Sequence, residues 1–163
     1  MKIIRKICML GDPAVGKTSL VRRFVYSTFD DKYISTIGTK IVKKDVNVQG
    51  NNLTLLIWDI LGQNATPLHS VYYKGASGAL VVADVTVEQS ITNIPRWIDG
   101  FRKIAGNAPV VIVGNKIDLK RVDEDYLAKL CGCSHPIVLT SAKTGEGVER
   151  AFTEISKLII GGG

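Results

Sequence analysis

The sequence lacks any long hydrophobic run. None of its apolar stretches approaches the roughly 20 residues that a membrane-spanning helix needs, and the opening MKIIRKICML is too short for a signal peptide. With 45% hydrophobic and 22% charged residues, the 163-residue chain has an ordinary globular composition. We therefore expect one domain, residues 1–163, in the cytoplasm.

Cysteine is scarce, with three residues: Cys8, Cys131 and Cys133. An odd number, with Cys8 in a predicted core strand, favours a reducing compartment over a disulfide framework. The stretch CGCSH (131–135) has a C-x-C spacing tighter than usual zinc spacing, and no second ligand pair lies elsewhere. An ordinary loop is favoured there over a metal site.

Acidic residues are outnumbered, 15 against 21 basic ones, which gives a net charge of +6. The basic residues are scattered and have no interleaved aromatics, so we expect no nucleic-acid partner. Lys40, Lys43 and Lys44 form one local group, which we interpret as a means of blocking pairing at a sheet edge.

Apolar runs alternate with helical patterns along the chain. We expect strands at 2–10, 39–48, 53–59, 78–84, 109–114 and 136–140, and helices at 17–26, 88–105, 123–130 and 146–160. QGNN (49–52) predicts a hairpin turn, and Pro95 predicts that the second helix begins near it or bends there. The pattern indicates an α/β fold: a six-stranded, mostly parallel sheet with one antiparallel edge strand and helices on both faces.

The stretch GDPAVGKTSL (11–20) follows a predicted strand and opens a predicted helix, the context that makes a phosphate-binding loop credible. Its backbone N–H groups would face phosphate oxygens, with Lys17 at the β- and γ-phosphates and the Thr18 hydroxyl on Mg²⁺. The predicted phosphate-binding residues are Ala14, Val15, Gly16, Lys17, Thr18 and Ser19. The motif indicates a nucleoside triphosphate without choosing the base.

A second motif, LLIWDILGQ (55–63), ends a buried strand in Asp59. This carboxylate is suited to hold Mg²⁺ through water. Gly62 offers a backbone amide to the γ-phosphate, and Gln63 can orient an attacking water. Asp-x-x-Gly is common turn chemistry, but its place at a strand end after a phosphate loop makes it informative.

Two further motifs, GNKID (114–118) and TSAK (140–143), select the base. Guanine offers an N1–H and an exocyclic amino group side by side, which the carboxylate of Asp118 can accept in a bidentate bond. Asn115 can tie the base edge to the phosphate loop, and the stem of Lys116 can cover the ring. In the segment Ser141, Ala142 and Lys143, the N–H of Ala142 can donate to guanine O6.

With these motifs in order over nearly the whole chain, the sequence resembles a small GTPase of the Ras superfamily and is most similar to Rab-like members. YISTIG (33–38) and YYKGASGALVVADVT (72–86) carry the Rab-like likeness. The resemblance implies the small G-protein variety of the P-loop nucleotidase fold. It also implies slow GTP hydrolysis with Mg²⁺, and switching of residues 28–38 and 60–75 between two states.

The resemblance implies three more site residues: Thr36 on Mg²⁺ and the γ-phosphate, Phe29 against guanine, and Tyr33 over the phosphates. It also implies effector proteins, an exchange factor and a GTPase-activating protein as partners of a monomer. Peripheral membrane association would be compatible with the family, but no motif in this chain supports it.

Three residues depart from the family pattern. Pro13 lacks an amide hydrogen inside the phosphate loop, Leu61 stands where alanine is usual, and Asn64 stands where an acidic residue is common. They motivate an alternative, a GTP-binding interaction module with negligible hydrolysis. A third interpretation, an ATP-using small-molecule kinase, leaves Asp118 and the Ser-Ala-Lys segment without a role.

Overall fold

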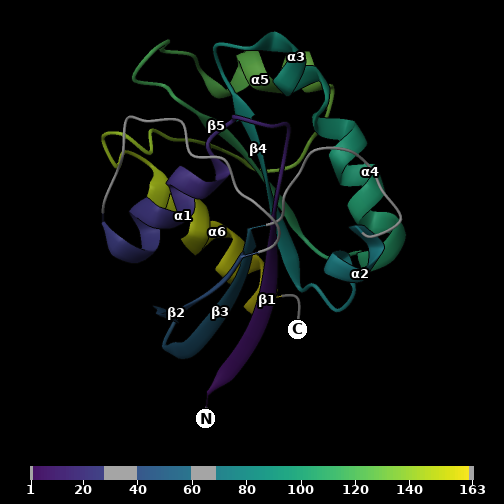
Figure 1. Ribbon diagram of the computed structural model, residues 1–163, viewed down its shortest axis with the longest axis vertical. Coiled ribbons are helices and arrows are strands. Elements are labelled where there is room, and N and C mark those ends of the chain that lie inside the picture. Colours follow the sequence, from purple (N-terminus) through teal and green to yellow (C-terminus); the bar gives the residue numbers. More distant parts are fainter. Residues whose placement is uncertain (1, 28–39, 60–68, 162–163) are drawn as a thin grey trace.

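The structure, a computed structural model, describes residues 2–27, 40–59 and 69–161. Its centre is a six-stranded sheet in the order β2-β3-β1-β4-β5-β6 (Figure 1). The strands are β1 (Ile3–Leu10), β2 (Lys40–Val48), β3 (Asn51–Asp59), β4 (Gly78–Asp84), β5 (Val110–Asn115) and β6 (Ile137–Leu139). β2 and β3 pair antiparallel and the other neighbouring strands pair in parallel, which confirms the predicted sheet.

Burial along each strand follows its place in the sheet. Every residue of β4 and β5 is buried, because central strands of a sheet covered on both faces need apolar side chains in both directions. β2 lies at the edge and mixes buried with exposed positions. Lys40 and Lys43 are exposed there, consistent with their predicted role in blocking edge pairing.

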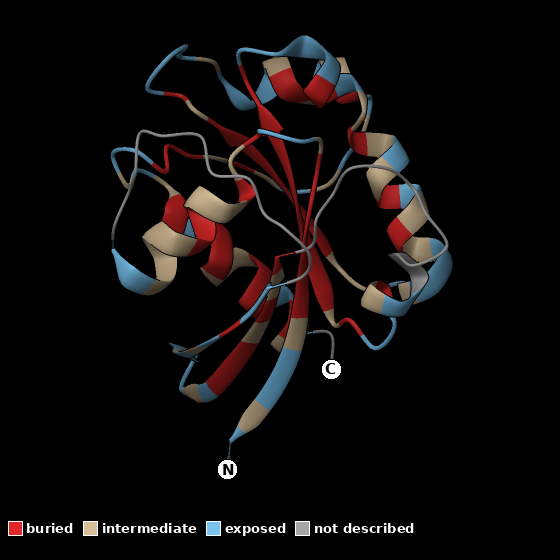
Figure 2. Cartoon of the chain, viewed as in Figure 1, coloured by how far each residue is buried: buried red, intermediate tan, exposed pale blue. Residues whose placement is uncertain are grey.

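Helices cover the two faces of the sheet and enclose two hydrophobic clusters (Figure 2). On one face, α1 (Lys17–Tyr26) and α6 (Val148–Gly161) pack through Leu20, Phe152 and Ile155. On the other lie α2 (His69–Tyr73), α3 (Glu88–Thr92), α4 (Ile94–Ala105) and α5 (Glu124–Cys131). None of these described helices combines the length and apolar character needed to cross a membrane.

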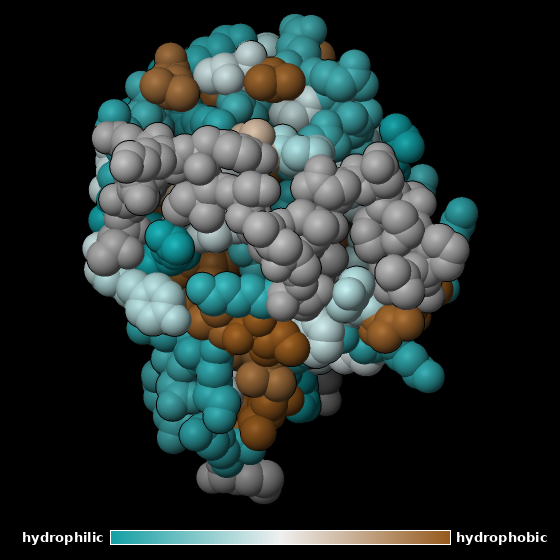
Figure 3. Space-filling view, viewed as in Figure 1, coloured by the Kyte–Doolittle hydropathy of each residue, from teal (hydrophilic) through white to brown (hydrophobic). Residues whose placement is uncertain are grey.

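Part of the sheet keeps apolar side chains at the surface, where Figure 3 shows hydrophobic residues gathered over the β1–β3 side of the molecule. Ile4 and Ile41 are each about half exposed (54% and 52%). The ammonium group of Lys6 lies 3.7 Å from the ring centre of the half-buried Trp58, a cation–π contact that shields that ring.

The helical segment predicted at 88–105 is two helices. The N–H of Asn93 closes α3 on the carbonyl of Gln89 at 3.0 Å, and α4 begins at the next residue. Pro95 lies in the first turn of α4, where its missing N–H has no helical partner to lose. Helix α2 lies inside the segment 60–75, which the resemblance implies to be a switch. The sequence predicted no helix there, because five residues are too few to show helical periodicity.

The predicted hairpin is confirmed, with a tighter turn than expected. Gln49 and Gly50 both have positive φ angles (53° and 80°), the conformation of a two-residue turn between antiparallel strands. β3 therefore begins at Asn51, two residues before the predicted start.

The cysteines differ from the expectation of a reduced chain. Cys131 and Cys133 form a disulfide, with their Cα atoms 5.4 Å apart, whereas Cys8 is free and buried. Gly132 ends α5 in the left-handed conformation (φ 65°) and turns the chain so that the flanking side chains meet. The residue spacing gave no sign of this pair.

Candidate functional site

The predicted site residues of the described chain lie at one edge of the sheet. β1, β3, β4 and β5 are parallel to one another and end at Leu10, Asp59, Asp84 and Asn115, and α1 begins beside them. In open α/β sheets this carboxyl edge is where ligands bind. The topology thus gathers the phosphate loop (residues 11–18), Asp59 and the base motifs.

Two glycines of the phosphate loop allow other backbone and side-chain groups to approach closely. A Cβ on Gly11 would lie 2.2 Å from the carbonyl oxygen of Val82, and a Cβ on Gly16 would lie 2.3 Å from Nδ2 of Asn115. Both have positive φ angles, 139° and 104°. Glycine is therefore required at both positions for two reasons: the backbone conformation and the lack of space for a Cβ.

Lys17 is buried beneath this loop. Its ammonium group donates to the carbonyls of Gly11 at 2.7 Å and Asp12 at 3.0 Å. Burial lowers the pKa of Lys17 to about 8, and the nearby carboxylates of Asp59 and Asp12 act in the opposite direction. A buried ammonium group held by two backbone carbonyls of the loop is suited to an anionic ligand.

The start of α1 has no side-chain cap, and its first turn holds no acidic residue, so the dipole there favours an incoming anion. Beside it, the hydroxyl of Thr18 donates to Oδ2 of Asp59 at 2.6 Å. These are oxygen donors of the kind that Mg²⁺ prefers, so the two residues fit the predicted metal site. Across the part of the chain that is described, no three His, Cys, Asp or Glu residues cluster as a metal site.

Asn115 connects the phosphate loop to the segment 141–143, called the base loop below. Its Nδ2 donates to the carbonyl of Val15 at 3.0 Å, and its Oδ1 accepts from the N–H of Ala142 at 3.2 Å and the hydroxyl of Thr140 at 2.9 Å. Asp118 accepts from the hydroxyl of Ser141 at 2.8 Å. Residues a hundred positions apart are thus bonded into one unit.

Lys116 joins the phosphate loop to the end of β4. Its ammonium group donates to the carbonyl of Ala14 at 2.9 Å and pairs with the buried carboxylate of Asp84 at 3.0 Å. Asp84 also accepts from the N–H and hydroxyl of Thr86. The sequence predicted that Lys116 would cover the base. It gave no signal for Asp84, because its partner Lys116 lies 32 residues away, just after the end of another strand.

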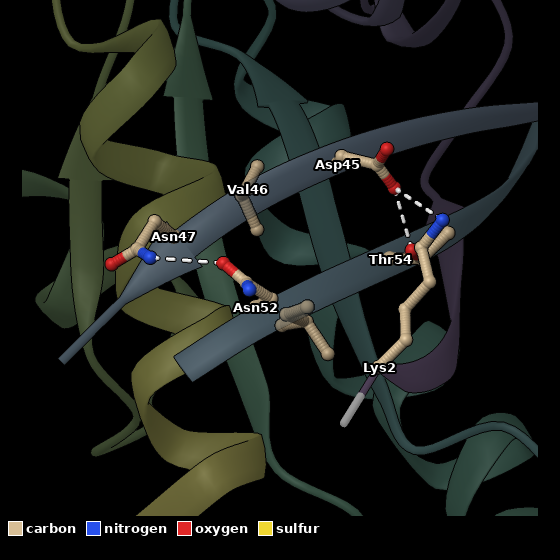
Figure 4. A pocket seen from close by; sticks show the side chains of 7 residues that line it. Lys2, Asp45, Val46, Asn47, Asn52 and Thr54 are labelled. Atoms are coloured by element: carbon tan, nitrogen blue, oxygen red, sulfur yellow. Dashed lines mark hydrogen bonds and ion pairs between the residues drawn. The ribbon is translucent and has the colours of Figure 1, made fainter. Parts of the chain in front are cut away.

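A polar hollow of about 480 Å³ lies at the opposite edge of the sheet (Figure 4). It is lined by the start of β1 and the hairpin end of β2 and β3, with Asp45 bonded to Thr54 at 2.5 Å and paired with Lys2 at 3.8 Å. Being at the amino ends of the parallel strands, it is separate from the phosphate loop.

Comparison with known proteins identifies the family. The model of the Ras family matches residues 6–161. Ras-related protein Rab-21 of Mus musculus is 37% identical over 163 residues, covering 95% of this chain and 72% of that protein. Rab-21 of Dictyostelium discoideum is 36% identical, covering 95% and 76%, and RabF1 of the same organism is 37% identical, covering 95% and 84%.

The chain belongs to the Ras family. It is a Rab-like small GTPase, a switch protein that binds and hydrolyses GTP. Members of the Ras family bind GTP and GDP, generally with Mg²⁺, and act with regulators and effectors. The fold described above is that of small GTPases with a phosphate-binding loop.

Several predicted site residues of this Ras-family chain lie outside the described residues: Phe29, Tyr33, Thr36, Gly62 and Gln63, with Leu61 and Asn64 among the noted departures. Their roles stay predictions.

The sequence missed one anchor of the phosphate loop. The carboxylate of Asp12 accepts from Nδ2 of Asn93 and from the indole N–H of Trp97, each at 2.8 Å. A carboxylate in a phosphate-binding loop needs hydrogen-bond donors to offset its charge, so the sequence could have predicted that Asp12 has such partners. It did not show that the partners come from α4 and the residue before it.

Proposed function

We propose that residues 1–163 form a single G domain that binds guanine nucleotide at the carboxyl edge of the sheet. The proposed contacts are Ala14, Val15, Gly16, Lys17, Thr18 and Ser19 for the phosphates, with Gly62 and Tyr33 beside them, and Phe29, Asn115, Lys116, Asp118, Ser141, Ala142 and Lys143 for the nucleoside. The observation that carries this proposal is the pair of hydrogen bonds made by the Asn115 side chain, one to the carbonyl of Val15 and one from the N–H of Ala142.

The base assignment rests on Asp118. We expect Asp118→Asn to weaken GTP and to shift the preference toward XTP, because xanthine has a carbonyl where guanine has its amino group. Losing the two hydrogen bonds from guanine to this carboxylate, which the bound base would cover, should cost roughly 2–5 kcal/mol. Competition binding of GTP and XTP measures the shift.

A matched control is Asp123→Asn. Asp123 caps α5 by accepting from the N–H of Tyr126, and asparagine caps helices equally well, so its change should leave the preference for GTP unchanged. An Asp118→Asn protein that still prefers GTP over XTP would remove Asp118 from the base site.

Thr18, Asp59 and Thr36 are the proposed ligands of Mg²⁺, the first two supported by their 2.6 Å contact. When bound, the metal ion neutralises charge on the phosphate oxygens. The Lys17 ammonium group, held under the loop by two carbonyls, stabilises charge on the β- and γ-phosphates. Its buried position lets this charge act without screening by bulk water.

Gln63 is proposed to orient the attacking water. We expect Gln63→Leu to leave GTP affinity nearly unchanged and to slow single-turnover hydrolysis at least about tenfold, since orientation of water contributes little to ground-state binding. Equal rates for this variant and the parent would exclude a catalytic role for Gln63.

The proposed setting is a monomer in the cytoplasm that meets an exchange factor, a GTPase-activating protein and effectors, and that can associate peripherally with membranes. The family relationship supports regulators and effectors in general. Sedimentation of the GDP and GTP forms tests the monomer: a shift to dimer mass in either form would contradict it.

A further inference from the structure

Arg23, in the last turn of α1, reaches across to the base loop. Its Nε donates to the carbonyl of Ala142 at 2.8 Å, and its Nη2 donates to the carbonyl of Lys143. These partners are 119 and 120 residues away in the sequence. A guanidinium presents its N–H groups in a rigid planar fork, so the two bonds fix the direction of two successive peptide groups.

The base loop is therefore held from two sides. On the β5 side, Asn115 accepts the N–H of Ala142 and Asp118 accepts the hydroxyl of Ser141. On the α1 side, Arg23 holds the carbonyl of Ala142. The N–H and the carbonyl of Ala142 belong to the two peptide groups on either side of its Cα. Because each of these groups has a side-chain partner, the orientation of this buried residue is set from both sides.

We propose that Arg23 is a positioning residue for recognition of the atom at position 6 of the purine. It acts by holding the peptide groups on either side of Ala142, so that the N–H, which donates to Oδ1 of Asn115 at 3.2 Å, can also donate to the base. The inference rests on the proposed function, in which that N–H donates to guanine O6 and Asp118 accepts from N1–H and the 2-amino group.

The role differs from general support of the fold. Arg23 bonds to the peptides that follow Ala142, and in the described contacts it has no bond to Asp118. Removing Arg23 should loosen recognition at position 6 and leave recognition of the 2-amino group intact. Two analogues separate these effects: 6-thio-GDP replaces O6 with a larger and weaker acceptor, and IDP lacks the 2-amino group.

The experiment measures the affinities of GDP, 6-thio-GDP and IDP by competition on parent, Arg23→Met and Arg23→Lys proteins. Arg22→Met is the matched control, because Arg22 precedes Arg23 in α1, is also half-buried, and has no hydrogen bond to the base loop in the described chain. Ratios of affinities are independent of the folded fraction of each preparation, so partial unfolding of a variant does not obscure the result.

We expect Arg23→Met to reduce the preference for GDP over 6-thio-GDP at least about threefold, the scale of one hydrogen bond. The preference for GDP over IDP should change less than about twofold in the same protein. Arg23→Lys, with one ammonium group in place of the fork, should lie between parent and Arg23→Met. Arg22→Met should match the parent in both ratios.

Equal losses for all three nucleotides in Arg23→Met would overturn the proposal, since a purely structural role lowers every affinity alike. The proposal would also be overturned if Arg23→Met reduced the preference for GDP over IDP as much as it reduced the preference for GDP over 6-thio-GDP. A parent that does not distinguish GDP from IDP would instead contradict the base assignment of Asp118, so the two failures are distinguishable.

Discussion

The indole N–H of Trp97 donates to the carboxylate of Asp12 at 2.8 Å, which bonds α4 to the phosphate loop. Asn93 donates to the other carboxylate oxygen, also at 2.8 Å. The carbonyl of the same Asp12 accepts from Lys17 at 3.0 Å. The limb of the loop before Pro13 is thus attached to a packed helix by bonds within the protein.

This attachment predicts an effect of Trp97→Phe on nucleotide release. Phenylalanine keeps an aromatic ring but removes the donor to Asp12. The phosphate loop of the variant is then held less firmly, and bound nucleotide has to order it. We expect GDP to dissociate faster by about threefold to tenfold, the scale of one net hydrogen bond, because Asn93 still donates to the same carboxylate. The measurement is the GDP dissociation rate in Mg²⁺.

The control is Trp58→Phe, because the buried indole N–H of Trp58 has no hydrogen-bond partner within the described chain. Its GDP dissociation rate should match the parent's. A double variant with Asp12→Ala completes the test: if Trp97→Phe speeds dissociation equally with and without Asp12, the contact between the two residues is not the cause.

The buried position of Lys17 predicts a pH-dependent stability of the nucleotide-free protein. Unfolded, its pKa is the ordinary 10.5, whereas burial lowers the folded pKa to about 8. Between these pH values the unfolded chain binds more protons, so the free energy of unfolding rises with pH, by up to about 3 kcal/mol from this group. Below pH 8 both states are protonated, and the contribution is constant.

Urea unfolding of the parent and of Lys17→Met across this range measures the effect as a difference between the two proteins. Taking the difference matters because burial raises the pKa of both Cys8 and Tyr73 to about 12, which lowers stability with rising pH in both proteins. Parallel curves for the two proteins would contradict a lowered pKa at Lys17.

Much of this architecture follows from local sequence patterns. The run from Gly78 to Ala83 is apolar and ends in Asp84, which predicts a central strand, and the structure has β4 at the predicted bounds Gly78–Asp84. α1 also has its predicted bounds, since the phosphate loop fixes its start. In contrast, α2 has five residues, and the division between α3 and α4 depends on how Asn93 ends one helix.

The predicted site motifs of the described chain also meet as expected, because parallel strands bring their carboxyl ends to one edge. Their anchors could not be predicted. Asp12 is 85 residues from Trp97, and Arg23 is 119 residues from Ala142, so no spacing in the sequence relates them. Side chains that position other residues leave weaker sequence signals than residues of the binding motif itself.

Gly16 has both a positive φ angle and no room for a Cβ, and substitution can separate the effects of these two constraints. Gly16→Ala adds a Cβ 2.3 Å from Nδ2 of Asn115 at a positive φ of 104°, so it strains the backbone and displaces the link to Val15. We expect GDP affinity to fall at least about tenfold, since strain of this kind costs of order 1–3 kcal/mol. Competition binding measures the loss.

Gly106→Ala is the matched control, because Gly106 also has a positive φ, 68°, but a Cβ there would meet no atom within 4 Å. It should lose stability of order 1–3 kcal/mol and keep the parent's GDP affinity. Equal GDP affinities for Gly16→Ala and Gly106→Ala would show that the contact with Asn115 does not contribute to binding.

Pro13 divides the anchored limb of the phosphate loop from the residues that follow, and its side chain is exposed. It lacks an N–H, but the residues from Ala14 to Thr18 keep theirs, so no essential phosphate donor is missing. We therefore expect Pro13→Gly to change GTP and GDP affinities by less than about threefold.

Hydrolysis should respond to Pro13→Gly more strongly than binding does. The proline ring fixes φ near −65° and stiffens the loop beside the proposed position of the γ-phosphate. A partner's arginine, which can accelerate hydrolysis roughly 10³–10⁵-fold, would enter on that side. Single-turnover rates with and without a GTPase-activating protein, measured alongside both affinities, test this. If Pro13→Gly raised affinity about tenfold and left hydrolysis unchanged, the missing N–H would be a phosphate donor after all, because that gain is the size of one charge-assisted hydrogen bond.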